Sequence, residues 1–316
     1  MPIVICSTIF GNIIVNYDIK GVCMESNQVI VAFLLLFLLL EFIRNQFPKK
    51  VLYKVHSVNL PETFNGYKIA VLADLHNKSF GKNNERVIKQ IKELRPDIIL
   101  IAGDLLVRKK PKKFDVALIF LKELSKICPI YYGLGNHEQS IQADDIKASV
   151  GYAEFVKKVK NMGVIFLDNE SISVIRKNSQ ICITGVSIDK MFFQKYKLPP
   201  MPEEHLQNLV GFLNKECYNI LIAHNPTYFE KYVSFGADLI VSGHLHGGVI
   251  RLPFLGGMLS PQYRFFPKYD GGRYDKASKT MLVSRGLGGH TIKFRIFNRP
   301  EIVVVTLASD KGCSNL

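Results

Sequence analysis

Apolar and polar positions alternate in blocks along most of the chain. From about residue 51 onward, short apolar runs such as Lys68–Ala73 (KIAVLA) are each followed by a segment whose apolar residues recur every three or four positions. An uninterrupted short apolar run predicts a strand buried on both faces, and the second spacing predicts an amphipathic helix. The alternation of the two predicts a layered α/β fold.

The first such unit is a strand at 68–73, a helix ending at Pro96 and a strand at 97–102. Asn83 or Asn84 is expected to cap this helix. Further helices are predicted at 114–126, 145–160 and 203–213 and near Tyr228. Further strands are predicted at 130–134, 164–167, 171–175, 180–187, 219–223, 238–242, 280–284 and 301–307.

One apolar run near the N-terminus differs from the others. Val29–Leu40 (VIVAFLLLFLLL) has no polar residue, and Phe42 and Ile43 extend it. A helix that spans a bilayer needs about 20 apolar residues, with a lower limit of about 17. The run at 29–43 is shorter, so it can span the bilayer only if the flanking side chains of Arg44 and Lys49 extend to the membrane interface. A secretory signal is disfavoured because no small-residue cleavage site follows. We therefore expect a single-pass membrane anchor.

The chain is thus predicted to have two parts. Residues 1–50 form an N-terminal segment with an anchor helix at about 29–43, and residues 51–316 form one domain. More cations follow the run than precede it, so the positive-inside rule favours a cytoplasmic domain. This rule does not fix the side of the membrane, and Met24, just before the run, is an alternative start to Met1.

Charge and cysteine content narrow the classes of function. The 316 residues include 41 Lys and Arg against 27 Asp and Glu, a net charge of +14. This excess suits an anionic substrate, a nucleic acid or an acidic membrane face. The basic residues form no aromatic-interleaved motif, so no specific nucleic-acid partner is expected. The 6 cysteines are scattered, which excludes a dense disulfide framework and a thiolate metal site.

Several predicted strands end on residues able to bind a metal. The loops are Asp74-Leu75-His76, Gly103-Asp104, Gly135-Asn136-His137-Glu138, His224, and Gly243-His244-Leu245-His246. Ligands of open α/β sheets bind beyond the carboxyl ends of the strands, so these loops are expected to form one site. A single Asp or Asn after a strand is usually a turn or cap residue, but the whole constellation is not explained in that way.

The residue types indicate the chemistry. Imidazole, carboxylate and amide oxygen without thiolate suit Mn, Fe or Zn, of which Mn is our first choice. Asp104 is able to bridge two ions, and two ions about 3.5–4 Å apart activate a hydroxide and stabilise in-line displacement at phosphorus. Glycine before Asp104, Asn136 and His244 is expected to permit tight turns and close approach of substrate.

In this order the loops resemble the calcineurin-like metallophosphoesterase family. The segments Gly243–Pro253 and Ser284–Glu301 further resemble the bacterial membrane-associated branch that contains the YkuE and YaeI phosphodiesterases. The resemblance covers about residues 51–308. It implies a four-layer α-β-β-α sandwich that hydrolyses phosphomonoesters, phosphodiesters or pyrophosphates.

The resemblance also implies a role for each residue of the site. Asp104 would bridge two divalent metal ions, and His137 would stand beside the leaving group as general acid or hydrogen-bond donor. The first ion would be bound by Asp74, His76 and His246, and the second by Asn136, His224 and His244.

The sequence departs from the family at one position. Many members have a carboxylate three residues after the bridging Asp, where it orients the catalytic histidine, but this chain has Val107. Glu138 and Asp145 are candidates to replace it. Arg108 is a candidate to bind the substrate phosphate as a bidentate donor, and a solvated place in the cationic run 108–110 is the alternative.

Two hypotheses of function follow. The first is a membrane-associated, dinuclear metal-dependent phosphoesterase in which metal-activated hydroxide attacks phosphodiester or pyrophosphate bonds of lipid- or envelope-derived substrates. The second is a non-catalytic binder of anionic polymers, either cell wall or nucleic acid, motivated by the charge of +14. A binder needs no complete ligand set, which favours the enzyme.

Overall fold

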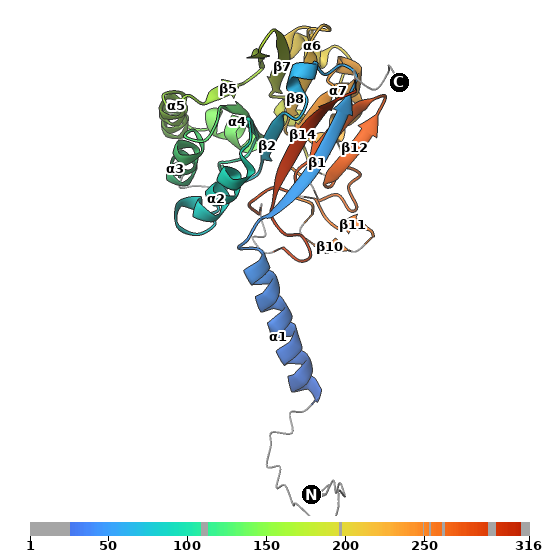
Figure 1. The fold of residues 1–316 in the computed structure, drawn as a ribbon. Coiled ribbons are helices and arrows are strands. Elements are labelled where there is room, and N and C mark those ends of the chain that lie inside the picture. Colours follow the sequence, from blue (N-terminus) through green and yellow to red (C-terminus); the bar gives the residue numbers. More distant parts are fainter. Residues whose placement is uncertain are drawn as a thin grey trace, which may run out of the picture. The chain divides into compact units, whose positions relative to one another are not determined.

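The computed structural model describes residues 26–108, 113–195, 198–248, 250–252, 254–260, 263–289 and 295–310. Figure 1 shows the helices and strands of these residues as a ribbon. Contacts divide the chain into two compact units, Met1–Leu40 and Glu41–Leu316. The assignment of 1–50 and 51–316 to separate parts stays a prediction.

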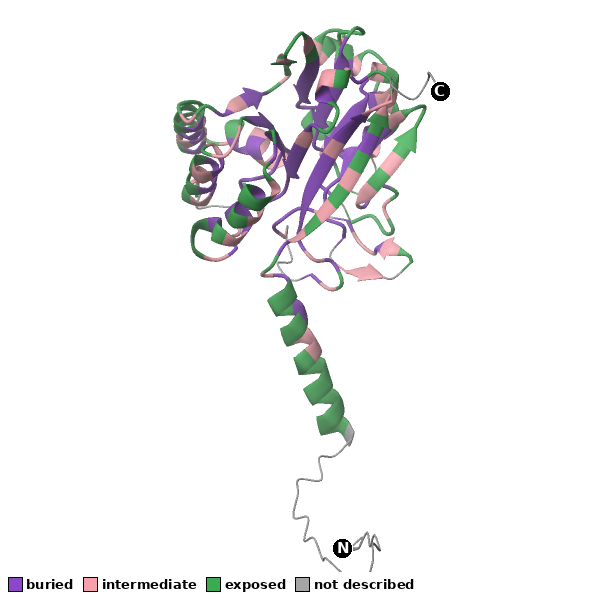
Figure 2. Ribbon diagram, viewed as in Figure 1, coloured by how far each residue is buried: buried purple, intermediate pink, exposed green. Residues whose placement is uncertain are grey.

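Helix α1 (Ser26–Arg44) contains the run predicted as an anchor. Its segment Asn27–Arg44 has a mean hydropathy of 2.0, and only 6% of the segment is buried. Figure 2 shows this helix as almost entirely exposed. By length and composition the helix is able to cross a membrane, and a signal sequence near the N-terminus satisfies the same criteria.

Two mixed six-stranded sheets form the body of the second unit. The first has the order β1 (Lys49–Ser57), β14 (Glu301–Ser309), β2 (Lys68–Leu72), β3 (Ile98–Ala102), β4 (Ile130–Gly133), β5 (Ile165–Leu167). Strands β2 to β5 are parallel, with Ile69 opposite Ile98, and β14 is antiparallel to β2. The carboxyl ends of β2, β3 and β4 therefore lie at one edge.

The second sheet is also mixed but has an antiparallel strand at each edge. Its order is β12 (Gly272–Lys276), β13 (Lys279–Val283), β9 (Leu239–Ser242), β8 (Tyr218–Ala223), β7 (Ser179–Val186), β6 (Glu170–Arg176). The four inner strands are parallel, and β12 and β6 are antiparallel edge strands. A separate two-stranded ribbon consists of β10 (Arg251–Leu252) and β11 (Gly256–Gly257).

Helices cover the outer face of each sheet. The first sheet carries α2 (Glu85–Leu94), α3 (Asp115–Leu124) and α5 (Ile146–Lys160), whose Ile91, Phe120 and Phe155 pack in one apolar cluster with sheet residues. The second sheet carries α6 (His205–Val210) and α7 (Phe229–Phe235). Inward residues of the two sheets, such as Leu100 and Ile220, form a third cluster between them. The layers thus run helix, sheet, sheet, helix (Figure 2).

The predicted α/β alternation is confirmed, and each predicted strand is present within about two residues of its expected bounds. The regular elements that were not predicted are β1, β12, the short ribbon strands β10 and β11, and the short helix α4 (Asn136–Gln142). Strands β1 and β12 are only partly buried edge strands and lack the uninterrupted apolar run on which the prediction relied. Single-turn helices lie at Glu62–Phe64, Lys82–Asn84, Lys190–Phe193 and Pro226–Tyr228.

Two local predictions were wrong. Asn84 precedes α2 with φ 63 and makes no side-chain cap bond, because its Oδ1 accepts the Phe80 backbone N–H at 2.9 Å instead. The predicted helix 203–213 is shorter, because Gly211 adopts φ 74 directly after Val210 and ends α6 there.

Candidate metal centre

The strand-end loops converge as the sequence predicted. Three groups of ligand atoms, each within 4.8 Å of one another, are Asp74, His76 and His246; His76, Asp104 and His137; and Asp104, His224 and His244. Oδ2 of Asp104 lies 3.1 Å from Nε2 of His224 and 3.9 Å from Nε2 of His76. Asp104 is therefore the carboxylate shared between the two sides of the cluster.

The backbone at these ligands is left-handed. Asp74, His76, Asp104, His244 and His246 all have positive φ, between 49° and 68°. Residues other than glycine adopt this region rarely and at an energetic cost, so the surrounding structure must enforce it. These bends turn the chain sharply where β2, β3 and β9 end and direct the side chains toward one point.

The glycines before the ligands make room for other ligands. A Cβ atom at Gly243 would lie 2.5 Å from Oδ2 of Asp74, and one at Gly135 would overlap Oδ1 of Asp104. The sequence predicted close approach of substrate at these positions. The described contacts show close approach of neighbouring carboxylates, Asp74 and Asp104, and the approach of substrate stays a prediction.

Backbone carbonyls orient two of the histidines. Nδ1 of His224 lies 2.6 Å from the carbonyl oxygen of Ala102, and Nδ1 of His76 lies 3.2 Å from that of Leu106. A carbonyl oxygen can accept a hydrogen bond only from a ring nitrogen that carries a hydrogen, so Nδ1 is the protonated nitrogen of each ring. When the ring is neutral, the lone pair is therefore on Nε2, which faces the cluster. This is the tautomer that binds a metal through Nε2.

Asn136 lines the same cavity as His137 and His244. It is the first residue of α4, and its Oδ1 is buried without a hydrogen-bond partner among the described residues. A buried carbonyl oxygen normally has a partner. An amide oxygen beside imidazoles and carboxylates is an acceptable ligand for a divalent cation, so the donor set fits the metal site typical of the family.

Burial and mutual charge shift the acid–base properties of the cluster. Burial raises the pKa of Asp74 to about 7. Burial opposes ionisation of Asp104 too, but His224, His137 and His76 hold its pKa well below the usual range. Burial disfavours the cationic form of His224, yet Asp104 and Asp74 raise its pKa to about 10. His224 therefore retains its second proton at neutral pH.

We expect metal affinity to rise with pH. A divalent ion that binds Nε2 of His224 must displace the proton on that atom, and the pKa of His224 is about 10. Below that pKa, the apparent affinity for Mn should rise by about tenfold per pH unit for each proton displaced. Competition titration against a chromogenic chelator at pH 6, 7 and 8 measures this slope. His224→Ala should reduce the slope, and the surface variant His56→Ala should keep it; a wild-type affinity independent of pH would contradict the prediction.

Glu138 has a structural role that the sequence did not reveal. Its buried carboxylate accepts N–H bonds from Asp104 at 2.9 Å, Leu106 at 3.0 Å and Gly135 at 3.1 Å, and the Tyr132 hydroxyl donates to it at 2.9 Å. Burial and the neighbouring Asp104 raise its pKa to about 7. Glu138 thus joins the loops after β3 and β4, and these bonds occupy both of its oxygens.

His137 meets a backbone donor in place of a carboxylate. Its Nδ1 accepts the Arg108 N–H at 2.9 Å, and its Nε2 lies 4.0 Å from Oδ2 of Asp104. Asp145, the other predicted replacement for the family carboxylate, caps α5 by accepting the Ala148 N–H. Val107 is partly buried beside Arg108.

A loop near the C-terminus reaches the cluster and was not predicted to do so. The buried Arg295 donates to the carbonyls of Arg285 and Gly288, and its Nη2 lies 3.4 Å from Nδ1 of His246. Asn298 donates to the carbonyl of His246 at 2.7 Å. Both residues follow a glycine-rich turn rather than an apolar run, so the strand-end pattern did not reveal them.

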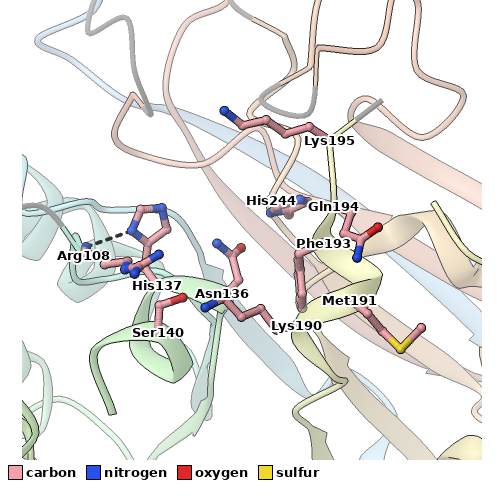
Figure 3. Close-up of a pocket in the computed structure, with 10 residues that line it drawn as sticks. All are labelled: Arg108, Asn136, His137, Ser140, Lys190, Met191, Phe193, Gln194, Lys195 and His244. Atoms are coloured by element: carbon pink, nitrogen blue, oxygen red, sulfur yellow. Dashed lines mark hydrogen bonds between the residues drawn. The ribbon is translucent and has the colours of Figure 1, made fainter. Parts of the chain in front are cut away.

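A cavity of about 600 Å³ opens beside the cluster (Figure 3). Asn136, His137 and His244 line it, together with Arg108, Ser140 and all residues of the segment Lys190–Lys195 except Phe192. The Phe193 ring packs edge-on against His244, with ring centroids 5.1 Å apart. The segment Lys190–Lys195 was not predicted to be part of the site, because no strand-end motif distinguishes it.

Residues 67–248 match the calcineurin-like phosphoesterase family. The chain belongs to this family. It is a metal-dependent phosphoesterase, and its buried His and Asp clusters are consistent with the dinuclear site typical of the family. The predicted family and enzyme class are thereby confirmed.

Known relatives of this phosphoesterase are distant. The metallophosphoesterase YkuE of Bacillus subtilis is 28% identical over 81% of this chain and 84% of YkuE. Phosphodiesterase YaeI of Escherichia coli is 26% identical over 76% of this chain and 82% of YaeI. A transmembrane protein with a metallophosphoesterase domain from Danio rerio is 28% identical over 82% of this chain and 57% of its own length.

Proposed function

We propose that the chain is a membrane-associated, dinuclear phosphoesterase for phosphodiester or pyrophosphate bonds of lipid- or envelope-derived molecules. The observation that carries this proposal is the lining of the cavity. Arg108, Lys190 and Lys195 supply positive charge, and Met191 and Phe193 supply apolar surface, next to Asn136, His137 and His244. Such a lining suits a substrate that joins a phosphate to an apolar group. The apolar helix α1 supports attachment to a membrane as a single-pass anchor.

Each residue of the site has a separate proposed role. One divalent ion would be held by Asp74, His76 and His246, and the other by Asn136, His224 and His244. Asp104 would bind both ions. Mn is our first choice over Fe and Zn. Bound there, the two ions supply Lewis acidity and an activated water for in-line displacement.

His137 would donate a hydrogen bond to the leaving group. Because its Nδ1 accepts the Arg108 N–H, the neutral ring has its hydrogen on Nε2, the atom that faces the cluster. The Arg108 guanidinium, on the rim of the same cavity, would bind a phosphate oxygen. Arg108 would thus act twice, through its backbone on His137 and through its side chain on the substrate.

The test is hydrolysis of bis-p-nitrophenyl phosphate by the full chain in detergent. The full chain is needed because Asn45 and Glu41 bond to Arg295 and Phe297, so a protein that starts at residue 51 would lose contacts near the cluster. We expect metal-stripped protein to be inactive and added Mn to restore release of nitrophenol. A folded, Mn-loaded chain that cleaves no diester, monoester or pyrophosphate would favour the binder of anionic polymers.

The variant His137→Gln separates catalysis from metal binding. Glutamine can still donate a hydrogen bond to the leaving group but cannot give it a proton as a general acid, so a general-acid role of His137 predicts that kcat falls by roughly a hundredfold to ten-thousandfold. Because His137 is outside the proposed ligand set, the number of bound Mn ions per chain should not change. Loss of bound metal in His137→Gln would instead make His137 a ligand.

A further inference from the structure

Exposed apolar side chains gather on one surface of the second unit. Phe254, Leu255, Phe265, Phe266 and Phe297 are all exposed; Phe254 is completely so, and Phe265 is 71% exposed. Phe254 and Leu255 lie in the turn between β10 and β11 (Figure 1). Except for Phe265, these residues border a single cavity of about 680 Å³, so they lie together although they come from separate segments. We call these five residues the Phe254 surface.

Basic side chains border the same cavity. Arg251, Lys268 and Arg285 line it, and among the described residues Asp270 is the one acidic side chain in the lining. Arg251 pairs with Asp270 at 2.9 Å and Arg285 with Glu301 at 3.7 Å. Nζ of Lys268 lies 3.9 Å from Oε1 of Glu230, and the Lys268 side chain is 74% exposed. The Phe254 surface therefore combines apolar rings with basic side chains, of which Lys268 is the one most open to solvent. Monomeric soluble proteins rarely expose such a patch without a binding role.

Hydrogen bonds connect this surface to the C-terminal turn of α1 and to the residues that follow the helix. The backbone N–H of Phe297 donates to Oε2 of Glu41 at 2.9 Å, and Glu41 directly follows Leu40 in the chain. Nε of Arg299 donates to the carbonyl of Phe47. The Phe254 surface is thus hydrogen-bonded to residues that lie within a few positions of the end of the apolar run.

We propose that the Phe254 surface inserts into the interfacial region of a lipid bilayer. Its rings would lie at the boundary between headgroups and acyl chains, and its basic side chains, chiefly the exposed Lys268, would attract anionic headgroup phosphates. The proposal rests on the membrane attachment in the proposed function, because the end of α1 brings this surface to the bilayer.

The surface also lies close to the metal centre. Nη1 of Arg251 donates to the carbonyl of Gly247 at 3.3 Å, and Gly247 follows the proposed ligand His246. On the other side, Asn298, the neighbour of Phe297, donates to the carbonyl of His246. Hydrogen bonds to the backbone of Gly247 and His246 thus connect the Phe254 surface to the loop that carries a proposed metal ligand.

Single tryptophans test the proposal, because the chain has none. Three full-length variants, Phe254→Trp, Phe33→Trp and Phe212→Trp, are reconstituted in vesicles of phosphatidylcholine and phosphatidylglycerol, with or without brominated acyl chains. All three positions are exposed, so the substitutions leave the core intact. We expect Phe254→Trp to show blue-shifted emission and to lose intensity with brominated lipid. Phe212→Trp, two residues beyond the end of α6, is the matched control and should do neither.

The outcomes distinguish this proposal from the membrane anchor. Quenching at Phe33→Trp but not at Phe254→Trp would keep the anchor and overturn the insertion of the Phe254 surface. Quenching at Phe254→Trp but not at Phe33→Trp would support the surface and sink the anchor. A blue shift at Phe254→Trp without quenching would mean that a second copy covers the surface, which overturns the proposal. Omitting phosphatidylglycerol should weaken quenching at Phe254→Trp; unchanged quenching would overturn the role of the cations.

Discussion

Replacing Asp104 with Asn will lower kcat/KM for bis-p-nitrophenyl phosphate on the order of a thousandfold or more. Asp104 belongs to two of the three ligand groups, and its Oδ2 lies between His224 and His76. Stabilisation by bound metal amounts to several kcal/mol, and each 1.4 kcal/mol or so is about tenfold in rate. Asparagine retains an oxygen to accept the His137 N–H, as Oδ1 of Asp104 does at 2.8 Å, so the loop should persist.

Two measurements check this prediction. Steady-state kinetics gives kcat/KM, and elemental analysis gives the metal bound per chain, which should fall because the bridging charge is lost. The control is Asp115→Asn, which changes an exposed carboxylate in the first turn of α3. An Asp104→Asn protein that retains wild-type activity and two metals would refute the bridging role.

Replacing Glu138 with Ala will lower the free energy of unfolding by about 3–5 kcal/mol, the range for removing one partner from a buried charged network. The Glu138 carboxylate accepts three backbone N–H groups and the Tyr132 hydroxyl. Alanine would leave these donors buried without acceptors and would remove the connection between the loops after β3 and β4. The effect on the fold should therefore exceed that of losing any single surface charge.

Urea unfolding of metal-stripped protein at one fixed pH measures this loss. Glu154→Ala, on the exposed side of α5, is the matched control and should change stability by no more than about 0.5 kcal/mol. Glu138→Gln should lie between the two, because an amide has one oxygen to accept these bonds. A Glu138→Ala protein as stable as Glu154→Ala would mean that water or a neighbouring group satisfies the donors.

The strand-end loops could be predicted from the sequence because the pattern there is local. Five apolar runs end on Asp, Asn or His, and parallel strands place their carboxyl ends at one edge of a sheet. The convergence of Asp74, Asp104 and His224 therefore followed from the strand assignments. Their left-handed backbone did not, because a non-glycine residue adopts positive φ only when distant contacts enforce it.

The hydrogen-bond partners of Glu138 could not be predicted from a local sequence pattern. The sequence offered it as a partner for His137, whereas the fold uses its carboxylate for the backbone of Asp104, Leu106 and Gly135. A buried carboxylate satisfies the nearest unpaired donors, and which donors are nearest depends on how two loops pack together. Asn84 failed as a helix cap for the same reason, since its oxygen meets the Phe80 N–H first.

By itself, the sequence determined the α/β alternation, the apolar helix and the set of ligand-type residues at the strand ends. Periodic burial leaves a periodic pattern of residues, and this pattern can be recognised without a structure. Only the tertiary structure decided that Arg295 and Lys190–Lys195 enter the site, that Asn45 bonds to Arg295, and that Phe254 and Phe297 share a surface. These contacts join irregular segments far apart in the chain, whose positions depend on the packing of the whole domain rather than on any local period.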